Sequence, residues 1–216
     1  VLAQQSWLEL ALLEYGAAET QAQCLSLLLR AQAPLDLTAL VSGFVLDELT
    51  HTELCVRVAN ALGPTPPLEY RDAQVFAPVT GAQGRPLLVA ACAVAREFCV
   101  AEGVTLHVLR QSLSSAEAPL LRAVWRRILR DEAAHAGFGW TFLQWAKPQL
   151  TTAEWVAVSD VVTSALTSTA QSVERLRRRP PAAYSALSAY GGVTTEAAIA
   201  CLQAACSAVS KSWHKR

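Results

Sequence analysis

The sequence predicts an all-α protein of one domain, in which two helical hairpins joined by a long connection form a four-helix bundle and two more helices follow. Ala and Leu dominate a chain that is 52% hydrophobic and has only 10 Gly and 10 Pro, a composition that favours helices over strands. Apolar residues recur every three or four positions, as they do on one face of a helix. Residues 63–86 interrupt these stripes with a stretch rich in Pro and Gly.

The first hairpin is predicted from its start and stop signals. The first helix covers residues 7–32 and begins behind a capping box formed by Ser6 and Glu9. Asp36 is predicted to cap the second helix, which runs to Leu62 before a Gly and Pro-rich stretch ends it. Two helices joined by so short a connection are expected to lie antiparallel.

The second hairpin follows the long connection of residues 63–86, which can cross a bundle from end to end. A third helix is predicted over residues 87–112. Ser114 and Glu117 have capping-box spacing for a fourth helix, which ends before Pro148. Hairpin, crossover and hairpin together are the ferritin-like topology.

Two further helices are predicted over residues 152–178 and 194–214, on either side of Pro and Gly pairs. We assign the whole chain, residues 1–216, to one domain with a core bundle over 6–147 and accessory helices over 151–216. The accessory helices are expected to pack against the bundle and to take no part in the chemistry.

Charge and cysteine content exclude several classes of protein. Lys plus Arg equals Asp plus Glu at 18 each, so no net field attracts the chain to nucleic acid or to an anionic membrane. The longest apolar run, residues 87–95, is far shorter than the ~20 residues of a membrane span, and no signal peptide is recognised. The six cysteines form no C-x-x-C pair and are expected to be buried as small hydrophobes. We therefore expect a soluble, cytoplasmic protein.

Two of the predicted helices carry a polar pair in the middle of an apolar stripe. Glu48 and His51 interrupt the second helix, and Glu132 and His135 interrupt the fourth. Burying an ionised carboxylate without a partner is very costly, so this pattern calls for a cation. Glu-x-x-His places both groups about 60° apart and one turn apart on a helix, where they can converge on one metal centre.

Each of the other two bundle helices supplies one Glu on its apolar stripe. Glu14 precedes the first Glu-x-x-His by 34 residues, and Glu102 precedes the second by 30, as two similar hairpins require. Glu9, Glu19 and Glu97 lie five residues away, about 140° around the helix, and are expected to be solvated. A lone Glu-x-x-His is common on helices, but two such motifs with a matching upstream Glu favour a metal site over coincidence.

An aspartate precedes each motif. Asp47 and Asp131 are candidates to accept a hydrogen bond from the ring N–H of a ligand histidine, which would fix its tautomer. The alternative is that both lie exposed on the helix surface. His107 and His214, the remaining histidines, are predicted to be surface groups.

These residues resemble the di-iron carboxylate proteins of the ferritin-like superfamily. The resemblance rests on Glu14, Asp47-Glu48-x-x-His51, Glu102 and Asp131-Glu132-x-x-His135, and it spans the first four predicted helices. The surrounding segments are similar to a bacterial group of ferritin-like domain proteins of unsettled activity. The resemblance implies the fold, the ligand set and a site that activates O₂.

Two iron ions fit this donor set best, with manganese or a mixed Mn/Fe pair as the alternative, because a closed structural zinc site prefers four ligands. Neighbouring positions on the same faces are mostly apolar and form either a substrate cavity or an ordinary core. These positions are Leu10, Ala18, Phe44, Cys55, Phe98, Leu106 and Gly139.

Three functions remain open. The first is an oxygenase or oxidase that uses O₂ and an electron donor on a small apolar organic substrate. The second is a ferroxidase or peroxidase of ferritin or rubrerythrin type, and the third is a non-enzymatic helical interaction module stabilised by metal. Rubrerythrins usually carry Cys pairs that this sequence lacks, so the first function ranks highest. A homodimer is left open, and no nucleic-acid or membrane partner is expected.

Overall fold

The structure is a computed structural model that describes residues 2–65, 67–69, 78–178 and 185–215. Every regular element within these ranges is a helix, which confirms the predicted all-α class. The chain divides into two compact units, residues 1–93 and 94–216, and each is described here by itself.

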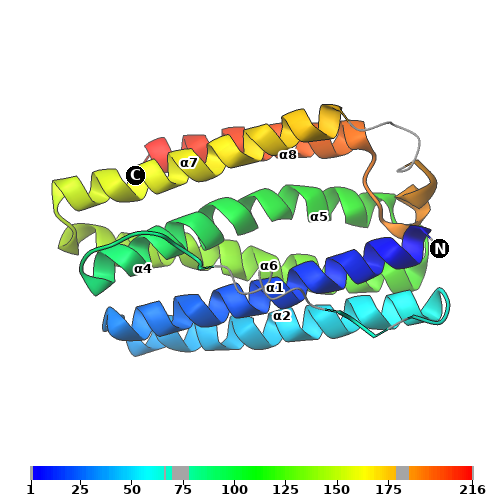
Figure 1. Cartoon of the computed structure of the whole chain (residues 1–216), viewed down its shortest axis with the longest axis horizontal. Helices are drawn as coiled ribbons and strands as arrows, with labels where there is room; N and C mark the ends of the chain where they lie inside the picture. Colours follow the sequence, from blue (N-terminus) through cyan, green and yellow to red (C-terminus); the bar gives the residue numbers. More distant parts are fainter. Residues whose placement is uncertain (1, 66, 70–77, 179–184, 216) are drawn as a thin grey trace. The chain divides into compact units, whose positions relative to one another are not determined.

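The first unit is built on an antiparallel pair of long helices, α1 (Leu2–Arg30) and α2 (Leu35–Ala61), which lie side by side in Figure 1. The side-chain amide of Gln4, near the start of α1, donates to the carbonyl oxygens of Gly63 at 2.7 Å and Pro64 at 3.0 Å, just beyond α2. These bonds join the two free ends of the hairpin. The helix α4 (Pro86–Val94) begins in the same unit.

The predicted caps of this hairpin are wrong. The helix α1 already begins at Leu2, so Ser6 lies inside it. The residue before α2 is Pro34, and Asp36 lies within the first turn, where its Oδ1 accepts a hydrogen bond from Leu37 N at 3.0 Å. An acidic residue in the first turn complements the helix dipole without being the capping residue, which explains why the sequence signal is displaced by two positions.

The core of the hairpin follows the helical period. The buried positions of α2 step from Val41 to Phe44, then through the polar pair to Cys55 and on to Ala59. Leu40, the chain neighbour of buried Val41, is 50% exposed. Adjacent residues lie about 100° apart around a helix, so burial of one position turns its neighbour outward.

Part of the predicted long connection is also held against this hairpin. The backbone N–H of Val79 donates to Gln23 Oε1 at 2.8 Å, and the Val79 side chain is buried. Residues 66 and 70–77 of the connection lie outside the described residues.

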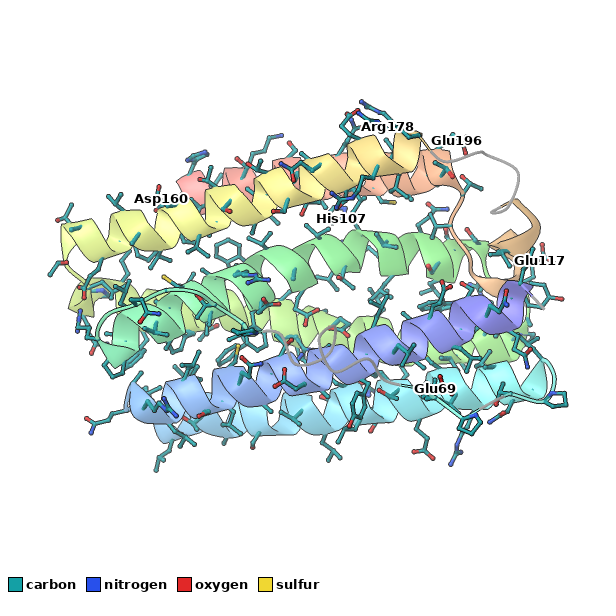
Figure 2. All side chains as sticks on the ribbon, in the orientation of Figure 1. Glu69, His107, Glu117, Asp160, Arg178 and Glu196 are labelled. Atoms are coloured by element: carbon teal, nitrogen blue, oxygen red, sulfur yellow. The ribbon has the colours of Figure 1, made fainter. Side chains whose placement is uncertain are left out.

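The second unit contains the remaining helices. In chain order they are the π-helical segment η1 (Ala95–Glu102), α5 (Gly103–Ser115), α6 (Pro119–Ala146), the short η2 (Lys147–Gln149), α7 (Thr152–Arg177), η4 (Ser185–Tyr190) and α8 (Thr195–His214). Within this unit α6 packs on η1 and α5, and α8 packs on α5 and α7. Charged residues such as Asp160, Arg178 and Glu196 are exposed on its surface (Figure 2).

The single regular helix predicted over residues 87–112 is wrong in detail. Its residues divide among α4, the π-helical segment η1 and α5. Because α5 continues to Ser115, Ser114 lies in its last turn and cannot cap the next helix. Instead α6 begins at Pro119, whose missing N–H costs nothing at the first helical position.

The two accessory helices agree with their predicted bounds. Thr151 and Glu154 form a complete capping box at the start of α7, and the Thr194 hydroxyl accepts from Ala197 N at the start of α8. Trp213 of α8 stacks on Trp155 of α7 with ring centroids 5.1 Å apart. Within the described ranges, no helix combines the length and the hydropathy needed to cross a membrane.

Candidate metal centre

The first unit brings together one of the two predicted ligand sets, which we call set 1: Glu14, Glu48 and His51. Glu14 comes from α1, while Glu48 and His51 lie one turn apart on α2. Their exposed fractions are 7%, 0% and 0%. His51 Nδ1 lies 3.4 Å from Glu14 Oε2 and 3.4 Å from Glu48 Oε2, and one ligand atom of each residue lies within 4.8 Å of the others. Two carboxylates and an imidazole therefore converge in an apolar core.

Gln21, to which the sequence pattern assigned no role, belongs to the surroundings of set 1. Its side-chain amide donates from Nε2 to Glu48 Oε1 at 2.5 Å, and the residue is only 2% exposed. Gln21 lies seven residues after Glu14, two helical turns along the same face of α1. A polar residue at that spacing within an apolar stripe was a signal that the sequence already contained.

Cys55 lies one turn beyond His51 and is fully buried. Burial, together with the negative charge of Glu14, raises the pKa of the Cys55 thiol well above its ordinary value. A thiol binds metal as the thiolate, so this cysteine suits the apolar lining of the site, as predicted, better than a ligand position.

The second unit contains the other ligand set, set 2: Glu102, Glu132 and His135. Glu132 and His135 lie one turn apart on α6, and Glu102 is the last residue of η1. Glu132 is 3% exposed and His135 fully buried, whereas Glu102 is half-buried. His135 Nδ1 lies 3.0 Å from Glu132 Oε2, and one ligand atom of each of the three residues lies within 4.8 Å of the others.

A close approach within the second unit positions Glu102. A Cβ built on Gly139 of α6 would lie 2.8 Å from Cys99 Sγ and 2.8 Å from Phe98 Cβ, closer than real Cβ contacts. Gly139 therefore allows η1 to lie directly against α6. π-Helical turns inside α-helices are frequent at functional sites, and this one ends at a candidate ligand.

Phe98 and Gly139, two of the positions predicted to line either a cavity or an ordinary core, are packed against each other in this contact. Phe98 is fully buried and packs edge-on against Phe138 with ring centroids 5.0 Å apart. Together with the atoms that crowd Gly139, this packing makes these positions ordinary core. A methyl group at Gly139 would have no room between α6 and η1.

The two aspartates differ in their surroundings. Asp131 is 8% exposed, and its carboxylate is bound by the guanidinium groups of Arg127 and Arg130 on the same helix, with Arg130 Nη2 at 3.0 Å. Asp47 is half-buried. A contact of either carboxylate with a ligand histidine stays a prediction.

Three other acidic residues were expected to be solvated. Glu9 is exposed, as predicted. Glu19 is half-buried and accepts hydrogen bonds from Gln23 at 2.7 and 2.8 Å. For Glu97 the expectation is wrong: its side chain is 18% exposed, lies 3.1 Å from Arg96 Nε, and has a pKa raised by burial. The π-helical turn explains the error, because its i to i+5 hydrogen bonds change which residues share a face.

His107 is also less exposed than predicted. It is half-buried on α5, on the side toward α7 and α8 in Figure 2, and burial lowers the pKa of its imidazole, with a smaller contribution from Arg110. His214 is exposed at the end of α8, as predicted.

The chemistry of the two sets fits a metal ion. Each offers two carboxylates and one imidazole in a buried environment, where paired anionic groups require a compensating positive charge. Oxygen and imidazole donors without thiolates suit iron or manganese. Comparison of the chain with protein-family models, curated proteins and solved structures gave no match.

Proposed function

We propose that set 1 and set 2 together bind two iron ions, and that the protein is a di-iron oxidoreductase that reduces O₂. The observation that carries this proposal is the repetition of one donor set, two Glu and one His, in each of the two compact units. A single such set is compatible with many sites. Its repetition at matching sequence spacing favours a paired centre.

The dinuclear form of the proposal rests on the ligand types and on the order of the helices. One Glu from each of two helices and a Glu-x-x-His motif from each of two others is the ligand pattern of di-iron and di-manganese carboxylate bundles. The predicted order of hairpin, crossover and hairpin is the ferritin-like topology in which such centres occur. Mn or a mixed Mn/Fe pair remains the alternative composition.

The residues of the chain then have separate tasks. The four glutamates supply negative charge to two divalent ions, and His51 and His135 complete one donor set each. The apolar residues around them, such as Phe44 and Cys55, keep bulk water from the ligands of set 1. Six protein ligands on two ions leave coordination positions open, and reduced iron supplies the electrons that O₂ requires.

The nature of the second substrate separates two versions of the proposal. A small apolar organic molecule, oxidised with O₂ and electrons from a donor, is the version we favour. The other version is a ferroxidase, in which ferrous ions are themselves oxidised, and the close packing at Phe98 and Gly139 is compatible with it.

The proposal is tested by loading the purified chain with Fe(II) under anaerobic conditions, counting bound iron, and then measuring O₂ consumption. We expect close to two ions per chain and rapid O₂ uptake. Glu48→Gln should abolish both, whereas Glu53→Gln, an exposed residue of the same helix with a 59% exposed side chain, should change neither.

Each other outcome has a defined meaning. Uptake that depends only on added iron identifies a ferroxidase, and uptake stimulated by an organic compound identifies an oxygenase or oxidase. Two bound irons without O₂ uptake would support the non-enzymatic interaction module. No bound iron in the wild-type protein would contradict the metal centre itself.

A further inference from the structure

Gln21 is a buried amide that the proposed chemistry leaves without a task. It lies on the core face of α1 with Ala18 and Cys24 as buried neighbours along the helix. Burying an amide is unfavourable unless it makes a strong hydrogen bond, and a leucine would fill such a position at no polar cost. The residue therefore points to a specific partner, and that partner is Glu48.

We propose that Gln21 is a positioning residue that holds the Glu48 carboxylate by Oε1 and so presents Oε2 to a metal ion beside His51. This inference rests on the proposed metal centre and adds a residue to it. The geometry that carries it is the 2.5 Å bond from Gln21 Nε2 to Glu48 Oε1, together with the 3.4 Å separation of Glu48 Oε2 from His51 Nδ1.

The two oxygens of Glu48 are thereby distinguished. Oε1 accepts from the amide, while Oε2 lies on the side where the imidazole of His51 and the carboxylate of Glu14 converge. A hydrogen bond to an ionised carboxylate is stronger than a bond between neutral groups, so it restricts rotation of the side chain. Fixing a ligand in this way before metal arrives reduces the ordering that binding requires.

The choice of residue type also fits this role. A lysine or arginine at position 21 would bind Glu48 as an ion pair and compete with the metal for its charge. A glutamine amide is a neutral donor, so it orients the carboxylate and leaves its negative charge for the cation.

The same helix provides a matched control in Gln23. Its amide donates to both oxygens of Glu19 at 2.8 and 2.7 Å, and its Oε1 accepts from Val79 N at 2.8 Å. Gln23 is thus a half-buried glutamine with a carboxylate partner that is not a candidate ligand. Losing it should affect the packing of the connection and leave metal binding unchanged.

The test compares Gln21→Met and Gln23→Met in the full chain by titration with Co²⁺ alone. Cobalt affinity and the visible absorption spectrum of bound Co²⁺ report ligand geometry, and thermal melts without metal report folding. We expect Gln21→Met to lower cobalt affinity ~10- to 100-fold and to alter the spectrum, as losses of ligand-orienting groups typically do. Gln23→Met should keep the wild-type affinity and spectrum.

A Gln21→Met protein that melts at a lower temperature but binds Co²⁺ with wild-type affinity and spectrum would overturn the positioning role. If that variant does not fold, Gln21→Asn retains an amide that is one methylene too short to reach Glu48, and the same loss is expected. A wild-type protein that takes up no Co²⁺ and no Fe²⁺ contradicts the metal centre itself, whereas wild-type uptake with an unaffected Asn variant contradicts only this inference.

Discussion

At the scale of single residues, the charged groups next to set 2 are Asp131 and the two arginines that bind its carboxylate. This carboxylate is 8% exposed and is the chain neighbour of Glu132, while Arg127 and Arg130 bind it from the same helix. The side chains of both arginines reach solvent, with exposed fractions of 39% and 68%. The single negative charge of Asp131 therefore offsets part of the positive charge of these two arginines, which would otherwise raise the potential at a cation site.

We predict that Asp131→Asn weakens metal binding ~10-fold, within the range typical of residues that act through a ligand. The substitution keeps the shape of the side chain but removes the negative charge that the guanidinium groups of Arg127 and Arg130 bind. Mn²⁺ titration of the variant beside wild type measures the change. Asp160→Asn, on the exposed surface of α7, is the control and should have no effect. Wild-type Mn²⁺ affinity in Asp131→Asn would contradict this electrostatic role.

At the scale of elements, the π-helical segment η1 distinguishes the structure from the regular helix that the sequence predicts. Periodicity placed Phe98 in the core correctly, because that depends on local spacing, whereas Glu97 and Glu102 are both half-buried. It could not locate the π-helical turn, since residue spacing assumes a regular helix throughout and does not register the close approach of η1 to Gly139 on another helix. Capping signals failed for a similar reason, because Ser6 and Ser114 lie where helical hydrogen bonding continues.

We predict that Gly139→Ala destabilises the folded protein by ~1 to 3 kcal/mol, the usual cost of overpacking a core. The added methyl would lie 2.8 Å from both Cys99 Sγ and Phe98 Cβ, so η1 must shift, and Glu102 with it. Metal affinity should therefore fall together with the free energy of unfolding.

Chemical denaturation and Mn²⁺ titration measure these two effects. Gly137→Ala is a matched control on the same helix, because a Cβ there meets no described atom within 4 Å. That control should be neutral or stabilising by up to ~1 kcal/mol, since alanine is the better helix former. Equal behaviour of the two variants would show that the approach of η1 to α6 tolerates a side chain.

The Glu97 carboxyl on η1 leads to a prediction about how the stability of the folded protein depends on pH. Burial raises its pKa above the ordinary value of 4.5, and Arg96 opposes the shift only in part. A folded-state pKa above the unfolded one stabilises the protein below pH 4.5, and this contribution is lost as the pH rises through the folded-state value. In the metal-free protein Glu97→Gln should therefore lose less stability than wild type between pH 4 and pH 7.

Urea denaturation of both proteins at several pH values within that range measures the difference. Glu53→Gln, which removes an exposed carboxylate from α2, is measured beside them for comparison. Parallel curves for Glu97→Gln and wild type would mean that the Glu97 carboxyl titrates alike in the folded and unfolded chains.

At the scale of the whole molecule, each compact unit contains one complete donor set, so the internal repeat seen in the sequence has a structural counterpart. Five of the six candidate ligands could be placed in the core from periodicity alone, because a charged residue within an apolar stripe is easy to recognise in the sequence. The sixth, Glu102, is half-buried. Gln21 was assigned no role from the sequence, because a neutral amide within an apolar stripe does not call for a cation as a buried charge does. The substrate could not be predicted from the sequence, because the spacing of apolar residues predicts which side chains are buried and not how much space remains between them.

A shared dinuclear centre and two independent mononuclear sites make opposite predictions for loss of one set. We predict that replacing set 1 by Glu48→Gln with His51→Asn lowers bound Mn²⁺ from two ions per chain to nearly none, and that Glu132→Gln with His135→Asn in set 2 does the same. In a shared centre some carboxylates would serve both ions, so removing one set would deprive the second ion of ligands and charge compensation. Electron paramagnetic resonance of the wild-type protein should show an exchange-coupled Mn²⁺ pair. Independent sites would instead retain one Mn²⁺ per chain in each double variant, with the six-line spectrum of an isolated ion in wild type, and that result would contradict the di-iron proposal while leaving two separate metal sites.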